Sequence, residues 1–259
     1  MLAIIMTEIE KLKRYAILKA GVIVVIFSVL FSFAPVLAND GFREDFPMVM
    51  VNILESNCIY FFPAMIVLTA GFIARREYTE DTLKNVLTVP VSLRKLLFGK
   101  IVVVLFLTIF FSILSGLLGI FLCGIAGLSN LTLILMIEWM ARIIFGNVFL
   151  FVALLPITVI STLSVDMVYL CTAAGFVYGF LASMEANLLN YYPVKAVLIL
   201  FDPLCGAGYD FLHYSKGSAL ITLLIVFCIS VGLFILIKPA AKTSHKTKAP
   251  KKTARAKGW

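Results

Sequence analysis

The sequence predicts an all-α integral membrane protein with six transmembrane helices. Hydrophobic residues make up 62% of the chain and charged residues 14%, whereas soluble domains carry about 25% charged residues. The mean hydropathy is +1.06. One membrane-spanning helix needs about 20 mostly apolar residues, and uncharged runs that approach or exceed this length cover residues 20–38, 57–74, 101–137, 143–165, 167–184 and 218–237.

The segment before the first run, residues 1–19, is predicted to form an amphipathic helix on the membrane surface. Charged residues occupy its other sides, and its apolar stripe consists of Leu2, Ile5, Met6, Ile9 and Leu12. No small-residue cleavage pattern follows the first apolar run, so this segment does not read as a signal peptide.

The third run, 101–137, is too long for a single span. The segment 124–130 contains two glycines and Ser129-Asn130, which favour a break in the helix. We therefore expect the third span to end near Ile125 and the fourth to begin between Thr132 and Ile143.

A charged loop at 75–100 separates the second and third runs. Thr79 is placed to cap a short helix whose first turn holds two acidic residues. Leu83 and Leu87 fall on one face of that helix, and Pro90 ends it. The pattern indicates a short amphipathic helix that another protein can contact; the alternative is an ordinary charged turn.

The segment 185–217, between the last two runs, is rich in aromatic residues. Its apolar stretch 194–201 is too short to cross the membrane, so a re-entrant or interfacial helix is expected there. The aromatic residues are Tyr191, Tyr192, Phe201, Tyr209, Phe211 and Tyr214. One interpretation is an aromatic belt at the membrane interface.

The basic residues predict that both chain ends are cytoplasmic. Four Lys/Arg precede the first run, six lie in 75–100 and eight in 238–259, whereas only Arg43, Lys195 and Lys216 would lie outside. This asymmetry follows the positive-inside rule. The tail 238–259 has no acidic residue and is expected to be disordered, either simply solvated or attracted to anionic lipid. It lacks interleaved aromatic residues and does not predict nucleic-acid binding.

Between the third and fourth apolar runs, one charged pair stands out. Glu138 and Arg142 are spaced i, i+4 with the acid first, the favourable order on a helix. Charge inside a membrane is by default a functional hypothesis, so the pair could line a translocation path. The alternative is that both residues stabilise the start of the fourth span at the outer interface.

Motifs that carry chemistry are missing from the sequence. Gly99-Lys100 ends like a phosphate-binding loop, but Arg94 stands five residues before Gly99, and Ile101 follows the lysine. The five cysteines and two histidines show no metal-ligand spacing. We therefore expect no catalytic residue, no metal site and no cofactor on this chain.

The charged loop resembles the cytoplasmic loop of ABC-2 type transporter permeases. The resemblance rests on Glu77, Thr82-Leu83-Lys84, Leu87, Pro90-Val91-Ser92, Arg94 and Gly99-Lys100, set between a second and a third span. In that family the loop holds a coupling helix that docks on the ATP-binding subunit, and residues 1–19 are similar to its elbow helix. Residues 8–14 resemble the opening of bacitracin- and lantibiotic-type permeases.

The resemblance implies a division of the chain and a set of docking residues. Residues 1–237 would form the transmembrane domain, with an elbow at 1–19, a coupling loop at 75–100 and an extracellular segment at 185–217; 238–259 would be a cytoplasmic tail. The residues implied to contact the ATPase subunit are Glu77, Thr79, Asp81, Thr82, Leu83, Lys84, Leu87 and Arg94. Tyr191, Tyr192 and Phe201 would belong to an extracellular gate rather than a simple belt.

The resemblance also implies partners and a function. The chain would be the plasma-membrane permease of an ATP-binding cassette exporter, paired with itself or with a sister permease. ATP and Mg would be bound by the separate ATPase subunit, and the cargo would be an amphiphile such as a peptide antibiotic or a lipid. The alternative is a secondary transporter or channel driven by an ion gradient, which needs ionisable residues near the bilayer midplane.

Overall fold

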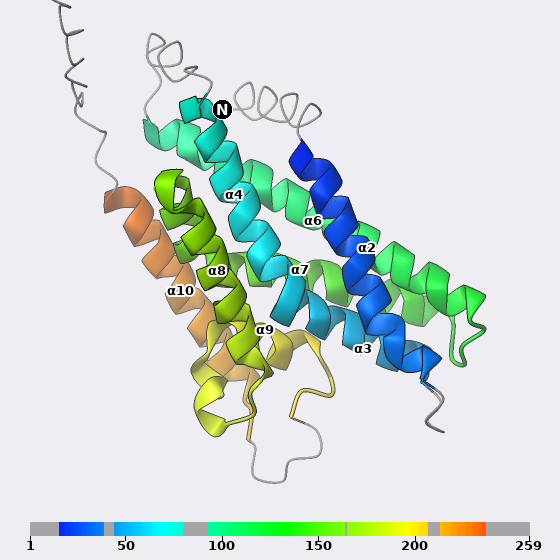
Figure 1. The fold of residues 1–259 in the computed structure, drawn as a ribbon. Helices are drawn as coiled ribbons and strands as arrows, with labels where there is room; N and C mark the ends of the chain where they lie inside the picture. Colours follow the sequence, from blue (N-terminus) through cyan, green and yellow to red (C-terminus); the bar gives the residue numbers. More distant parts are fainter. Residues whose placement is uncertain (1–15, 39–43, 80–92, 164, 207–212, 237–259) are drawn as a thin grey trace, which may run out of the picture.

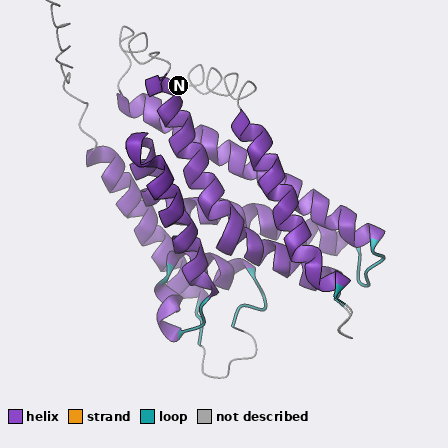
Figure 2. Ribbon diagram, viewed as in Figure 1, coloured by secondary structure: helices purple, strands orange, loops and turns teal. Residues whose placement is uncertain are grey.

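The computed structural model describes residues 16–38, 44–79, 93–163, 165–206 and 213–236, and all regular structure in these ranges is helical (Figure 2). The long helices are α2 (Ala16–Leu37), α4 (Phe62–Thr79), α6 (Leu93–Ile125), α7 (Leu133–Leu163) and α10 (Lys216–Leu236). The shorter elements are α3 (Phe46–Ser56), η1 (Asn57–Phe61), η2 (Val165–Met167), α8 (Val168–Phe180), η3 (Leu181–Ser183), η4 (Asn187–Tyr191) and α9 (Pro193–Phe201).

Five of the described helical stretches are long and apolar enough to cross a membrane. They are Ile17–Leu37, Phe46–Arg76, Lys95–Ile125, Leu133–Leu163 and Lys216–Leu236, while Val168–Ser183 is a shorter apolar helix. Large apolar side chains such as Ile23, Phe27 and Leu30 are exposed on the bundle surface, as lipid-facing residues are. The predicted all-α membrane fold is confirmed. The predicted fifth span, at 167–184, is not established, because the helix found there is shorter than the other candidate spans.

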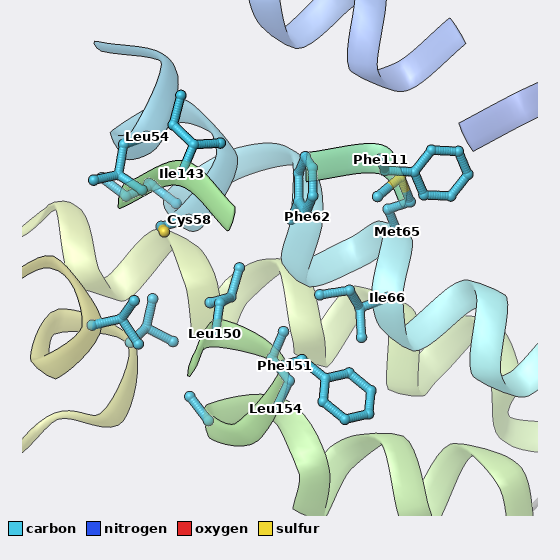
Figure 3. Close-up of a cluster of buried hydrophobic side chains, with 14 of the residues drawn as sticks. Leu54, Cys58, Phe62, Met65, Ile66, Phe111, Ile143, Leu150, Phe151 and Leu154 are labelled. Atoms are coloured by element: carbon cyan, nitrogen blue, oxygen red, sulfur yellow. The ribbon is translucent and has the colours of Figure 1, made fainter. Parts of the chain in front are cut away.

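Helix α7 lies at the centre of the bundle. It packs against α4, α6 and α10, and also against α8 and α9, while α2 packs on α3 and α6. In Figure 1, α6 and α7 run across behind α2 and α4, and α9 lies at the end of the bundle opposite the final turn of α4. The core between α3, α4 and α7 contains Leu54, Phe62, Ile66, Ile143 and Leu150, all almost inaccessible (Figure 3).

The second span begins earlier than the sequence predicts. The uncharged run starts at residue 57, but the helix starts at Phe46 and continues through η1 into α4. Asp45 precedes it, and Pro47 suits a first turn, where the missing N–H has no intrahelical role. The Asp45 carboxylate accepts hydrogen bonds from the Ser129 hydroxyl and the Asn130 amide, so this helix start is fixed to the loop that follows α6.

A buried polar bridge coincides with the π-helical turn η1. Asn57 is fully buried, accepts a hydrogen bond from the Ser28 hydroxyl at 2.8 Å, and donates one to the Ser115 hydroxyl at 3.0 Å. One side chain thus ties α2, η1 and α6 together in the apolar interior. The inserted residue of a π-turn is often found where a side chain is redirected in this way.

Two glycines allow α8 to approach the second span closely. A Cβ on Gly179 would lie 2.6 Å from the Ile59 carbonyl oxygen, and one on Gly175 would lie 3.1 Å from the Pro63 carbonyl oxygen. Small residues spaced i, i+4 let membrane helices pack backbone to backbone. The predicted break between the third and fourth spans agrees with the structure: α6 ends at Ile125, and α7 starts at Leu133.

Candidate functional site

The predicted docking residues belong to the connection between α4 and α6. Glu77 and Thr79 are in the last turns of α4, and Arg94 is in the first turn of α6. The remaining ones, Asp81, Thr82, Leu83, Lys84 and Leu87, lie outside the described residues, as does the predicted amphipathic helix at 1–19. Their part in docking stays a prediction.

Polar contacts hold the two helices that flank this connection. Lys100 of α6 is 2% exposed, and its ammonium donates a hydrogen bond to the Ile73 carbonyl of α4 at 3.2 Å. Arg75 of α4 lies over the Tyr169 ring of α8, 5.3 Å from its centroid. The ends of α4, α6 and α8 are therefore tied together at the base of the connection. The sequence motif included Lys100, but its buried contact with α4 was not predicted; a lysine at the edge of an apolar run was the available signal.

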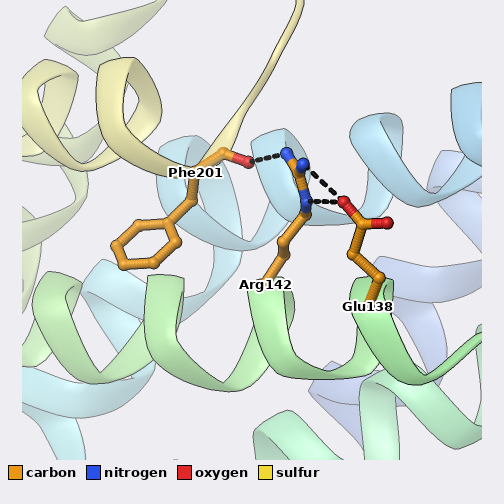
Figure 4. Close-up of polar contacts among 3 residues, drawn as sticks. All are labelled: Glu138, Arg142 and Phe201. Atoms are coloured by element: carbon orange, nitrogen blue, oxygen red, sulfur yellow. Dashed lines mark hydrogen bonds and ion pairs between the residues drawn. The ribbon is translucent and has the colours of Figure 1, made fainter. Parts of the chain in front are cut away.

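At the opposite end of the bundle, Glu138 and Arg142 form the predicted ion pair. Arg142 Nη2 lies 2.6 Å from Glu138 Oε1, and Nε lies 3.1 Å from the same oxygen. Arg142 Nη1 also donates to the Phe201 carbonyl at 3.1 Å (Figure 4). The guanidinium thus joins α7 to the last residue of α9, where one orphan carbonyl would otherwise lack a donor.

The three residues of the predicted extracellular gate are not brought together. Tyr191 is 67% exposed, while the Tyr192 hydroxyl donates to the Tyr178 carbonyl of α8 at 2.5 Å. Phe201 instead packs on Phe149 of α7, with ring centroids 5.3 Å apart. Tyr192 and Phe201 therefore anchor the ends of α9 to two different helices, and no single aromatic cluster forms. A role in gating stays a prediction.

A buried ion pair fixes α9 itself. Lys195 is 3% exposed, and its ammonium lies 2.5 Å from Glu185 Oε1. The Tyr214 hydroxyl donates to the other oxygen of Glu185 at 2.6 Å, and its ring lies 5.5 Å from the ammonium. Burial and the adjacent Glu185 carboxylate raise the pKa of the Tyr214 phenol, so it remains a hydrogen-bond donor.

Asp202 extends this group of charges at the C-terminal end of α9. It is 4% exposed; one carboxylate oxygen accepts the Leu204 N–H at 2.8 Å, and the other accepts no N–H or hydroxyl hydrogen bond among the described residues. Burial raises the pKa of Asp202, while the Leu204 N–H and the Lys195 ammonium act in the opposite direction. Glu55 of α3 interacts electrostatically with Asp202, Lys195 and Glu185, and its carboxyl group shares a hydrogen bond with that of Asp202. Three segments thus contribute to one charged cluster: α3, the stretch at Glu185, and α9 with its C-terminal end.

Sequence reasoning did not identify this cluster. Glu55 was excluded from the second span by its charge, and Lys195 was counted only as an outside basic residue. The spacing of Glu185 and Lys195 across an expected loop gives no helical or strand signal. Among the described residues no group of three or more His, Cys, Asp or Glu side chains is placed to hold a metal ion.

Comparison with protein families identifies the chain more closely. The family model described as "ABC-2 family transporter protein" matches residues 4–182, more than two thirds of the sequence. The matched region includes α2 through α8 and the connection between α4 and α6. No curated protein and no solved structure matches the chain significantly.

Proposed function

Because the chain belongs to the ABC-2 family of transporter proteins, we propose that it is the permease subunit of an ATP-driven exporter of an amphiphile. The family match supports a membrane permease component of an ABC transporter. The direction of transport and the cargo, such as a peptide antibiotic or a membrane lipid, are our proposal. The proposed location is the plasma membrane, with both chain ends cytoplasmic.

The proposed mechanism uses a separate ATPase subunit, which would bind ATP and Mg. That subunit docks on the connection between α4 and α6 through Glu77, Thr79, Asp81, Thr82, Leu83, Lys84, Leu87 and Arg94. Two permease chains, identical or related, enclose the path, and closure of the ATPase subunits moves the bundles against one another. The hydrogen bond from Lys100 to the Ile73 carbonyl supports this proposal, because helices joined at the base of a docking segment move together.

The docking proposal is tested by pull-down of the ATPase subunit with the double variant Glu77→Ala, Lys84→Ala. We expect a lower yield and lower ATP-dependent transport, with the permease still folded. The matched control is Lys246→Ala, Lys248→Ala in the basic tail, which should leave both unchanged. Full yield and full transport in the first double variant would contradict the docking assignment.

A gradient-driven transporter is the second candidate, and one observation favours it. Glu55 lies inside the second span and interacts with Lys195 and Asp202, so ionisable residues are less scarce than the sequence suggests. Transport by the permease and ATPase together should nevertheless need ATP and survive collapse of proton and sodium gradients. Gradient-dependent transport by the permease alone would overturn the ABC mechanism.

A further inference from the structure

A cavity lies between α2 and α3, at the end of the bundle opposite the connection between α4 and α6. Its volume is about 490 Å³, within the range of about 300–1,000 Å³ typical of small-molecule sites. Its walls are mostly apolar and include Phe31, Pro35, Ile59 and Tyr60. Glu55 supplies the one carboxyl group among its lining residues.

The charges behind this wall favour a cationic ligand. Glu55 interacts with the carboxylates of Asp202 and Glu185 as well as with the Lys195 ammonium. The Lys195 ammonium is already engaged by Glu185, and the Arg142 guanidinium by Glu138 and the Phe201 carbonyl. Four carboxyl groups therefore share two cations in this region. The hydrogen bond between Glu55 and Asp202 needs a proton on one of the two, which leaves three negative charges against two positive ones. A positive group in the cavity would complement that excess of negative charge.

The Asp202 carboxyl group points to the same deficit from a second direction. Asp202 is 4% exposed, its Oδ2 atom accepts no N–H or hydroxyl hydrogen bond among the described residues, and its neighbour on that side is the Glu55 carboxyl group. A buried carboxylate that is only partly compensated is costly. A cation bound at Glu55 would offset part of the repulsion between Glu55 and Asp202, so both residues would gain from its binding.

The aromatic rim of the cavity fits a cation with an apolar chain. The rings of Phe31 and Tyr60 meet edge to face, with centroids 6.0 Å apart. Aromatic faces attract ammonium groups within about 6 Å. Outside the rim, α2 exposes Ile23, Phe27 and Leu30, and these form an apolar surface along which an alkyl chain can continue.

We propose that this cavity binds the ammonium group of a single-chain amphiphile, with the cation at Glu55 and the alkyl chain leaving past Phe31 along α2. Binding needs no ATPase subunit. The identification of this amphiphile as the class of cargo rests on the proposed export function.

Equilibrium binding of radiolabelled dodecylamine to the purified chain in phosphatidylcholine nanodiscs tests the proposal. Saturable binding should be competed by dodecyltrimethylammonium and not by dodecyl sulfate or dodecanol. A further arm replaces part of the phosphatidylcholine with phosphatidylethanolamine; competition in that arm would identify an amino lipid as a source of the same ammonium chemistry.

Two variants assign the site. Glu55→Gln keeps the shape of the side chain and should lower the affinity about tenfold or more, because it removes one partner of a poorly solvated charge pair. Phe31→Leu keeps an apolar contact and should lower the affinity about two- to fivefold through loss of the ring. Asp166→Asn is the matched control: it removes one exposed carboxylate from η2 and should bind as the wild type does.

The outcomes separate this proposal from the proposed function. Equal binding of dodecylamine and dodecyl sulfate, or unchanged binding in Glu55→Gln, would overturn the site. If ATP-dependent transport of another cargo were intact in that case, the proposed export function would still be supported. Saturable, Glu55-dependent binding by a chain that associates with no ATPase would support the site and contradict the exporter.

Discussion

Replacing Lys195 with methionine should destabilise the protein more than removal of an exposed charge at the same end. Methionine keeps an unbranched apolar side chain of similar length but lacks the ammonium group. The native ammonium is 3% exposed, lies 2.5 Å from Glu185 and acts on Asp202, itself 4% exposed. Removing one partner of a buried pair costs about 3–5 kcal/mol. Because Glu185 remains 25% exposed, we expect a loss near the lower end, about 3 kcal/mol.

The assay is unfolding in mixed micelles of increasing SDS content, followed by circular dichroism. Lys216→Met is the matched control; Lys216 is exposed at the start of α10, so its loss should change the free energy of unfolding by about 0.5 kcal/mol or less. The double variant Lys195→Met, Glu185→Gln should recover part of the loss, since it leaves one fewer uncompensated charge. A single variant as stable as the wild type, or a double variant without recovery, would refute the reasoning.

Three further changes test other contacts in the same SDS titration. Gly179→Val should cost about 1–3 kcal/mol, because its side chain would collide with the Ile59 carbonyl; an unchanged transition would contradict close packing of α8. Asn57→Leu should cost about 1 kcal/mol by leaving two serine hydroxyls unpaired, and Asn57→Ser, which is too short to bridge both, should not restore it. Burial raises the pKa of Asp202, so the folded state binds this proton more tightly than the unfolded chain. The resulting stability is complete below about pH 4 and is lost as the pH rises through the raised pKa; Asp202→Asn should remove that dependence, and identical pH profiles would contradict it.

Composition predicts the helices of this fold because the favourable free energy of transferring apolar side chains into lipid adds up over all the residues of a span. The break after Ile125 was predictable for a local reason: Gly124 and Gly127 flank it, and Ser129-Asn130 follow. The start of α7 at Leu133 falls within the predicted interval. These features depend on residues that are close together in the sequence, so they can be predicted from the sequence alone.

The charged cluster was not predictable, because its members meet only in the folded chain. Glu55 precedes the second uncharged run and so appeared to lie outside the span, yet the helical stretch Phe46–Arg76 includes it. Lys195 of α9 and Asp202 at the C-terminal end of α9 lie within electrostatic reach of it. The bridge at Asn57 likewise needs Ser28 and Ser115 from two other helices. A charge or an amide in a span signals that a partner must exist, but the sequence does not say which one.

The contacts of α7 suggest how the two ends of the bundle are linked in the proposed transport cycle. The Ser161 hydroxyl donates to the Val67 carbonyl of α4 at 3.3 Å, while the Arg142 guanidinium binds the Phe201 carbonyl of α9. Between these points α7 packs closely on α4, and close-packed interiors transmit displacement with little compression. A movement imposed on the end of α4 would therefore carry α7 and α9 with it. Helix α2 packs mainly on α3 and α6 and makes few contacts with α4, so a movement of α4 would be passed to α2 less directly than to α7.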